Sequence, residues 1–374
     1  MAGIYIHIPY CMKACTYCDF HFSTSLKSKD KLLEAIVSEI KIRNKEINGY
    51  ISSIYFGGGT PSILNIEEID RIISCIKNNY NIKSNVEVTI EANPEDINLK
   101  YLSSLFLLGV NRLSIGIQSL NDDVLEWMNR AHNSSDALSS VKTAKKAGFN
   151  NISIDLIYGV PHKFNRDWQA ELELIKDINI QHISAYSLTV EKKTALDYQI
   201  KKGLIEMLDD DGFSSEYEIM RNSLLEDNFM QYEVSNFCKQ GFESKHNSSY
   251  WKSIPYLGIG PSAHSYDEKS RRWNVSNNNK YIVGVLSNKL NFQTEVLSNI
   301  DIANEIILTG TRTIYGFSKD KIINLLNNNQ IDSFLSQVDK LIANNYLTKH
   351  NDIIKVNLKQ NFLSDYIARE LFVV

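Results

Sequence analysis

The stretch Ile4-Tyr5-Ile6-His7-Ile8-Pro9-Tyr10-Cys11-Met12-Lys13-Ala14-Cys15-Thr16-Tyr17-Cys18 decides the fold and chemistry of this chain. It joins an apolar, β-rich run to a loop in which three of the chain's five cysteines have the spacing C-x3-C-x2-C. A structural zinc site normally uses four protein ligands. Three thiolates on one tight loop instead suit a [4Fe-4S] cube with three irons bound by protein and the fourth iron open.

Other uses of these cysteines stay open on the residues alone. His21 could complete a Cys3His zinc site, and the thiols could be unconnected or form one disulfide with one spare. We expect no secretory segment, because the first strand starts almost at Met1 without a charged region or apolar core before it. A reducing cytoplasm is therefore predicted, where disulfides are rare. Cys75 and Cys238 are predicted to be small buried hydrophobic residues.

Bulk composition narrows the class of protein. At 374 residues, the chain is long enough for one large domain and a smaller one. A net charge of −4 argues against a general affinity for nucleic acid. No apolar run approaches the roughly 18 residues of a spanning helix, although peripheral membrane contact stays open. The Asn-rich stretch 274–292 is predicted to be a surface excursion.

The order of strands and helices predicts an α/β fold. Apolar, β-rich runs lie at about 3–8, 52–56, 86–91, 112–117, 152–157 and 182–187. Helical periodicity lies between them, most clearly at 28–48, 66–79 and 135–147. Strands that alternate with helices form parallel sheets with right-handed crossovers. Because six units are too few to close an eight-stranded barrel, we expect an open partial (β/α)6 barrel.

Polar and glycine-rich segments follow the ends of these strands. They are the cysteine loop, Gly57-Gly58-Gly59-Thr60-Pro61, Glu91-Ala92-Asn93-Pro94, Gly116-Ile117-Gln118-Ser119, Asp155-Leu156-Ile157-Tyr158-Gly159-Val160-Pro161 and Ser184-Ala185-Tyr186. Parallel barrels place their chemistry at the carboxyl ends of the strands, so these segments should meet at one mouth. Carboxylates and an amide there suit a ligand with ammonium and hydroxyl groups, and Arg130 suits a carboxylate.

These motifs resemble a known family. The cysteine spacing with Tyr17 before the last cysteine is similar to that of radical S-adenosylmethionine (SAM) proteins. Across about 3–270, the chain resembles the oxygen-independent coproporphyrinogen III oxidase family. The resemblance implies a partial barrel with a [4Fe-4S] cluster on Cys11, Cys15 and Cys18. It also implies SAM contacts from Tyr5, Gly58, Gly59, Thr60, Glu91, Gln118, Arg130 and Asp155.

Two departures separate this chain from the oxidases. Phe20 stands where they carry a further cysteine, and strand one begins at residue 3, where they have an N-terminal extension. Both features are those of an oxidase-like branch regarded as heme chaperones. The segment His246-Asn247-Ser248-Ser249-Tyr250-Trp251 matches the HNxxYW motif of that branch, which implies heme contacts at His246, Tyr250 and Trp251. On the residues alone, a hydrogen-bonded core histidine is the simpler interpretation of His246.

We expect three regions: the barrel at 1–225, a family-specific extension carrying HNxxYW at 226–298, and a mostly helical, winged-helix-like domain at 299–374. The expected function is a cytoplasmic heme chaperone that binds a [4Fe-4S] cluster, SAM and heme, and passes heme to an acceptor protein. The alternative is an enzyme that uses an electron donor to form a 5′-deoxyadenosyl radical and acts on a porphyrinogen. No nucleic-acid partner is expected, and a homodimer stays open.

Overall fold

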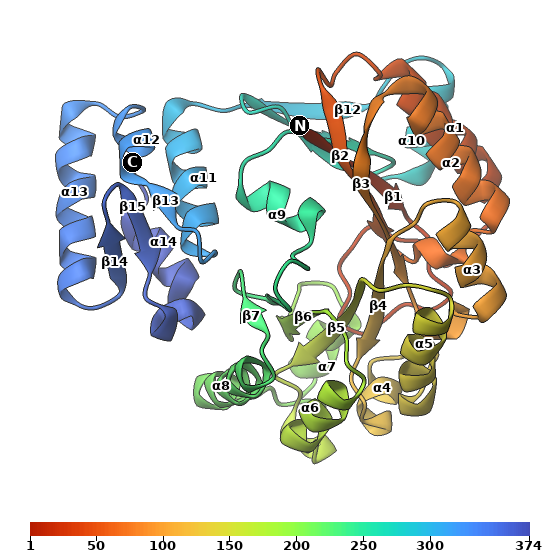
Figure 1. Cartoon of the computed structure of the whole chain (residues 1–374), viewed down its shortest axis with the longest axis horizontal. Coiled ribbons are helices and arrows are strands. Elements are labelled where there is room, and N and C mark those ends of the chain that lie inside the picture. Colours follow the sequence, from red (N-terminus) through yellow and green to blue (C-terminus); the bar gives the residue numbers. More distant parts are fainter.

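The computed structural model describes all residues, 1–374, and divides into a large sheet-based domain and a smaller C-terminal domain (Figure 1). Each has its own hydrophobic core. The larger core runs from Ala2 to Val285, and the smaller one from Ala303 to Val373. A third cluster of seven buried residues, between Val124 and Ile205, belongs to the large domain, so the two domains fold around separate cores.

Six parallel strands form the centre of the large domain. They are β1 (Ala2–Ile8), β2 (Tyr50–Gly58), β3 (Asn81–Ala92), β4 (Arg112–Gln118), β5 (Ile152–Tyr158) and β6 (His182–Ser187), and they lie in that order. The outer, convex face is covered by α1 (Lys29–Ile42), α2 (Ile66–Asn79), α3 (Leu99–Leu107), α4 (Asp122–Trp127), α5 (Ser134–Lys146) and α6 (Trp168–Asp177) (Figure 1). The predicted parallel sheet and the open partial (β/α)6 barrel are confirmed.

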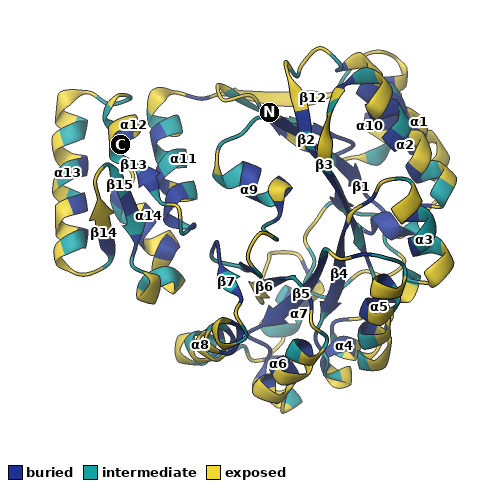
Figure 2. Ribbon diagram, in the orientation of Figure 1, coloured by how far each residue is buried: buried dark blue, intermediate teal, exposed yellow.

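The sheet has an apolar outer face and a polar inner face because side chains alternate along each strand. On β1, the fully buried Ile4, Ile6 and Ile8 belong to the core shared with the helices. Tyr5 points to the other face, where its ring lies near those of Tyr55 and His246. Figure 2 shows these strands as the most continuously buried part of the molecule. The barrel interior is therefore lined by polar side chains.

The barrel stays open because β1 and β6 pair with further strands and not with each other. Beyond β1 come β9 (Tyr256–Ile259), β10 (His264–Tyr266), β11 (Ser270–Asn274) and β12 (Phe292–Val296), and beyond β6 come β8 (Asn236–Cys238) and β7 (Met230–Gln231). The remaining helices of this domain are α7 (Ala195–Lys201), α8 (Asp210–Glu226), α9 (Lys245–Trp251) and α10 (Asn278–Leu286). Helix α9 lies on the concave side, between the sheet and the C-terminal domain (Figure 1).

The Asn-rich stretch 274–292 is not a surface excursion, so that prediction was wrong. It forms α10, whose Tyr281, Ile282 and Val285 are buried in the main core. The Tyr281 hydroxyl donates to Glu39 Oε2 over 2.6 Å, and Asn277 caps the helix. Three buried apolar side chains at helical spacing outweigh the polar asparagines, which serve as cap and solvent face.

The C-terminal domain contains α11 (Asn299–Thr311), β13 (Phe317–Ser318), α12 (Lys319–Ile323), α13 (Asn328–Ala343), β14 (Leu347–His350), β15 (Ile353–Val356) and α14 (Ser364–Leu371). Its three strands pair antiparallel in the order β13-β15-β14. The predicted mostly helical, winged-helix-like domain is confirmed. Backbone bonds from Val234 N to Arg312 O (3.0 Å) and from Ile314 N to Tyr232 O (3.2 Å) attach it beside the barrel opening. None of the helices combines the length and hydropathy that crossing a membrane requires.

Candidate functional site

The cysteine loop is fixed against the glycine-rich loop after β2. Gly59 N donates to Ile8 O (2.9 Å), and Thr60 N donates to Tyr10 O (2.7 Å). A Cβ atom at Gly59 would stand 2.7 Å from the carbonyl oxygen of Tyr10, so only glycine permits this approach. The two predicted ligand-binding loops therefore form one unit at the carboxyl edge of β1 and β2.

The three loop cysteines are partly exposed free thiols. Burial is the main cause that raises the pKa of Cys11 and raises that of Cys18 to about 11. Thr60 Oγ1 donates to Cys11 Sγ (3.4 Å), and Arg130 Nη1 donates to Cys15 Sγ (3.3 Å). Donors aimed at sulfur stabilise thiolates, as they do around iron–sulfur clusters. The residues present fit a cluster.

The zinc alternative fits less well. His21 Nε2 is hydrogen bonded to Asn278 Oδ1 (2.8 Å), so that nitrogen is already occupied. No set of three or more His, Cys, Asp and Glu side chains converges as it would around one metal ion. A cube does not require such convergence, because each thiolate binds a different iron.

Two partly buried carboxylates lie on the inner faces of β3 and β5. Glu91 accepts from the Tyr55 hydroxyl (2.8 Å) and from Gly58 N (3.2 Å). Burial, followed by repulsion from Asp155, raises the pKa of Glu91 to about 7. Asp155 accepts from Ser114 Oγ (3.2 Å), and burial raises its pKa to about 6. Neither carboxylate has a cation within ion-pair distance, so both could receive the positive groups of a ligand.

Arg130 is held beside the cysteine loop. Its Nη2 donates to Gly116 O (2.7 Å) and to Asn93 Oδ1 (2.8 Å), while its buried Nε has no partner. Asn93 also donates to Thr60 Oγ1 (3.3 Å), so it joins Arg130 to the glycine-rich loop. Asn93 was not predicted as a site residue. Its place two residues after Glu91, where β3 ends, was the available signal.

The remaining predicted SAM residues lie at the same mouth. Gly58 has φ +108°, and a Cβ there would meet the His7 ring at 2.5 Å. Gln118, which has φ +69°, closes β4 beside Gly116. The Tyr5 hydroxyl is hydrogen bonded to His7 Nδ1 (3.1 Å). A positive φ is uncommon among residues other than glycine. The residues that do have one cluster at ligand-binding and active sites.

The predicted heme residues lie elsewhere, on α9 at the opposite end of the barrel interior, which we call the floor. His246 is 1% exposed and hydrogen bonded through both ring nitrogens, to Ser53 Oγ (2.9 Å) and to the Tyr250 hydroxyl (2.8 Å). Burial lowers its pKa to about 3, so the imidazole is neutral. Trp251 is partly buried, and its Nε1 has no partner. The geometry of His246 is that of a core histidine.

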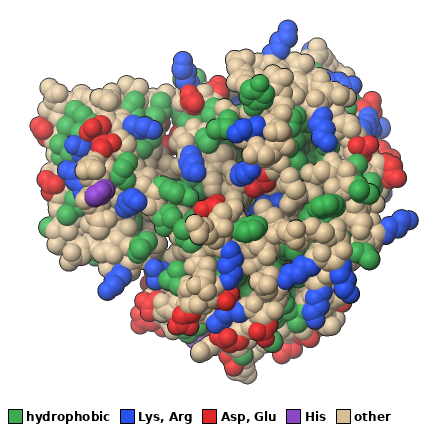
Figure 3. Space-filling view, in the orientation of Figure 1, with side chains coloured by type: hydrophobic (Ala, Val, Ile, Leu, Met, Phe, Trp, Pro, Cys, Tyr) green, Lys and Arg blue, Asp and Glu red, His purple; other side chains and the backbone are tan.

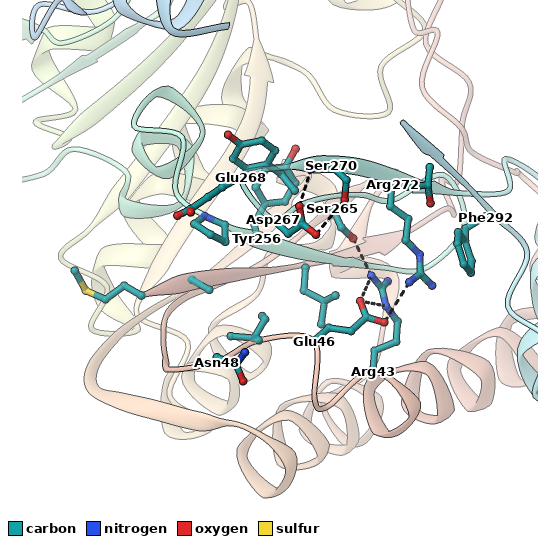
Figure 4. A pocket seen from close by; sticks show the side chains of 17 residues that line it. Arg43, Glu46, Asn48, Tyr256, Ser265, Asp267, Glu268, Ser270, Arg272 and Phe292 are labelled. Carbon is teal, nitrogen blue, oxygen red and sulfur yellow. Dashed lines mark hydrogen bonds and ion pairs between the residues drawn. The ribbon is translucent and has the colours of Figure 1, made fainter. Parts of the chain in front are cut away.

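A surface pocket of about 850 Å³ lies away from both groups, between the end of α1 and the β9–β12 extension (Figure 4). Arg43 there pairs with Glu39 and Glu46, and Arg272 pairs with Glu46 over 3.2 Å. None of the predicted cluster, SAM or heme residues lines this pocket. Its charged side chains largely satisfy one another, so we assign it no function.

Comparison with known proteins identifies the family. The model of the radical SAM superfamily matches residues 5–175. The heme chaperone HemW of Bacillus subtilis is 34% identical over 86% of this chain and 86% of its own length. The chain belongs to the HemW family of radical SAM proteins. HemW of Lactococcus lactis is 32% identical over 95% of this chain and 92% of its own length.

The likeness in fold extends to a solved structure. Coproporphyrinogen III oxidase (HemN) from Escherichia coli superposes with a TM-score of 0.86, over 99% of this chain and 90% of that one, at 22% identity. At that identity the superposition establishes the fold. Membership of the radical SAM superfamily implies a [4Fe-4S] cluster and SAM, in agreement with the chemistry of the mouth residues.

Proposed function

We propose that this protein is a heme chaperone that holds a [4Fe-4S] cluster and SAM at the barrel mouth and passes heme to an acceptor protein in the cytoplasm. The observation that carries the proposal is the meeting of three free thiols, two partly buried carboxylates without an ion-pair partner, and Arg130 at one edge of the sheet. The heme-binding part of the proposal is supported by the HemW relatives, which are named heme chaperones.

Different residues of the mouth would bind the cluster and SAM. Cys11, Cys15 and Cys18 would ligate three irons, and the cluster would supply an open iron and one-electron reducing power. Glu91 and Asp155 would accept hydrogen bonds from the ammonium and ribose hydroxyls of SAM.

Other groups at the mouth shape the space that SAM would fill. Gly58 and Gly59 would let backbone approach the ligand closely. Arg130 would offer its guanidinium to the SAM carboxylate. Tyr5, Thr60 and Gln118 would border the same space.

For heme, the proposed contacts are His246, Tyr250 and Trp251. Iron could bind His246 only after its bond to Ser53 or Tyr250 is exchanged. Helix α9 has seven residues and packs on β1, β2 and α11, so a displacement of this one helix would free the ring. Heme uptake at this motif therefore requires movement of α9.

The second candidate is an enzyme acting on a porphyrinogen, which the fold shared with coproporphyrinogen III oxidase favours. Two assays on the same preparation distinguish these candidates. Anaerobically reconstituted protein should bind hemin with a saturable Soret shift near one equivalent and deliver it to apomyoglobin. It should leave coproporphyrinogen III unconverted in the presence of SAM and dithionite. Protoporphyrinogen IX as product, without saturable hemin binding, would replace the chaperone with the oxidase.

A further inference from the structure

Arg112, the first residue of β4, is a buried cation without a partner. The residue is 1% exposed, and none of its three guanidinium nitrogens has a hydrogen-bond acceptor. Thr89, which faces it on β3, is fully buried, and its hydroxyl likewise has no partner. A guanidinium carries five donors, and a buried one without acceptors or a counter-charge is strongly disfavoured.

The counter-charges of Arg112 lie above it, inside the barrel. On the inner faces of their strands, Thr89 is followed by Glu91, and Ser153 is followed by Asp155. The positive charge of Arg112 lowers the pKa of both carboxyl groups, against the burial that raises them. The small side chains of Ser114 and Ser153 leave room for the long arginine side chain between the strands.

Other groups facing the two carboxylates do not replace Arg112. The surrounding phenols, whose pKa values burial raises, stay neutral; they are Tyr5, Tyr55, Tyr186 and Tyr250. The Cys11 thiol faces Glu91 with a raised pKa. Arg130 acts on Asp155, but its hydrogen bonds go to Asn93, Gly116 and Cys15. Arg112 is therefore the one cation in this interior with no other partner.

We propose that Arg112 is a positioning residue of the SAM site, whose charge holds Glu91 and Asp155 ionised together so that both can receive the cationic ligand. The inference rests on the proposed SAM site and adds to it a residue that need not touch SAM. Without this charge, these two neighbouring, partly buried carboxylates would share a proton near neutral pH. The site would then lose one of its two acceptors for positive charge.

The test measures how SAM affinity depends on pH. The anaerobically reconstituted full chain is titrated with radiolabelled SAM by equilibrium dialysis, between about pH 6 and about pH 9, as wild type, Arg112→Gln and Arg112→Lys. We expect wild-type affinity to fall below about pH 7, because the ionised carboxylate binds and Glu91 has a pKa of about 7. In Arg112→Gln the midpoint should rise by at least about one pH unit. The ionised fraction of Glu91 at pH 7 would then fall from about one half to about one eleventh, so SAM affinity at pH 7 should be roughly fivefold weaker and should recover at pH 9.

Arg112→Lys is the matched control because it keeps the charge and loses the planar fork, so its midpoint should stay near that of wild type. The amino group of SAM titrates in the same range, but it does so equally in every variant. If Arg112→Gln does not fold, Arg112→Met, which is similar in length and apolar, carries the same test.

Two results would overturn the inference while leaving the SAM site intact. One is a loss of affinity in Arg112→Gln by the same factor at every pH, as a purely structural role would give. The other is an unchanged profile. Wild-type protein that binds no SAM at any pH would instead remove the proposed site itself, and this inference with it.

Discussion

The mouth and the floor of the barrel are both polar and rich in motif residues, yet their ionisable side chains differ in the partners they have. At the floor, His246 is bonded to Ser53 and Tyr250, and Glu87 Oε1 and Oε2 accept from the backbone of His246 and Lys245, both over 3.0 Å. At the mouth, Glu91 and Asp155 have no ion-pair partner. Histidines with hydrogen-bond partners at both nitrogens stabilise the fold, whereas carboxylates without a counter-charge leave a position for a cationic ligand.

The floor contains two copies of one arrangement. Ser53–His246–Tyr250 is matched by Ser153–His182–Tyr232, with distances of 2.7 Å and 2.8 Å to the two nitrogens of His182. Both histidines are buried, and burial lowers the pKa of each. Since His182 lies outside the HNxxYW motif, it provides a control for any special role of His246.

The largest effect is expected from Cys15→Ala. Reconstituted wild-type protein should hold about four irons per chain, and this variant should hold almost none, because two thiolates do not retain a cube. Iron analysis and the visible spectrum measure the difference. Cys75→Ala, which removes a buried thiol away from the mouth, should keep the iron. Wild-type iron content in Cys15→Ala would show that the mouth is not the cluster site.

The next effect compares two glutamates on the inner face of β3. Glu91→Gln should weaken SAM binding by roughly 10- to 100-fold, since a hydrogen bond to a charged group contributes about 1.5–3 kcal/mol. Glu87→Gln, which weakens the cap of α9 instead, should lower the melting temperature and leave SAM affinity alone. Equal losses of SAM affinity in the two variants would contradict the assignment of SAM binding to the mouth and not to the floor.

The third test separates heme binding from folding. His246→Ala and His182→Ala should each cost about 2–5 kcal/mol of unfolding free energy, because each leaves a cavity and unpaired hydroxyls. If α9 carries the heme site, only His246→Ala should also weaken hemin binding, by tenfold or more, with the iron–sulfur spectrum retained. Hemin titration of the two variants measures this. Equal hemin affinities would assign His246 to the core alone.

The smallest expected effect is the loss of unfolding free energy at acidic pH that His246 and His182 cause. His246 and His182 have folded pKa values below the unfolded value of about 6.5, so the unfolded state binds more protons as pH falls below 6.5. Between pH 6.5 and pH 5.5 the protonated fraction of an unfolded histidine rises from about 0.5 to about 0.9. His246 should therefore lower the unfolding free energy by about 1 kcal/mol over this range, and His182 should act in the same direction. The raised pKa values of Glu91 and Asp155 act with the opposite sign in this range.

Denaturant unfolding at the two pH values isolates the histidine contribution. In His246→Gln, the fall in stability on acidification should be smaller than in wild type by about the same 1 kcal/mol. An unchanged difference between the two pH values would show that the ring is already protonated or accessible in the folded protein.

Much of the fold and of the mouth could be predicted from the sequence. Alternation of side chains and helical periodicity are local properties, so all six inner strands lie where the apolar runs predicted them. The predicted cluster and SAM residues meet at one edge because parallel strands end on the same side. α10 was missed because its apolar positions stand among asparagines.

The sequence by itself determined the barrel, its mouth and the family, since these follow from periodicity and from motifs within short segments. Only the tertiary structure decided which polar residues are satisfied. The sequence marks His246 as a heme contact and says nothing of Arg112. Contacts from distant segments saturate His246 and leave Arg112 unpaired. Hydrogen-bond satisfaction depends on partners brought together by folding, which no local pattern contains.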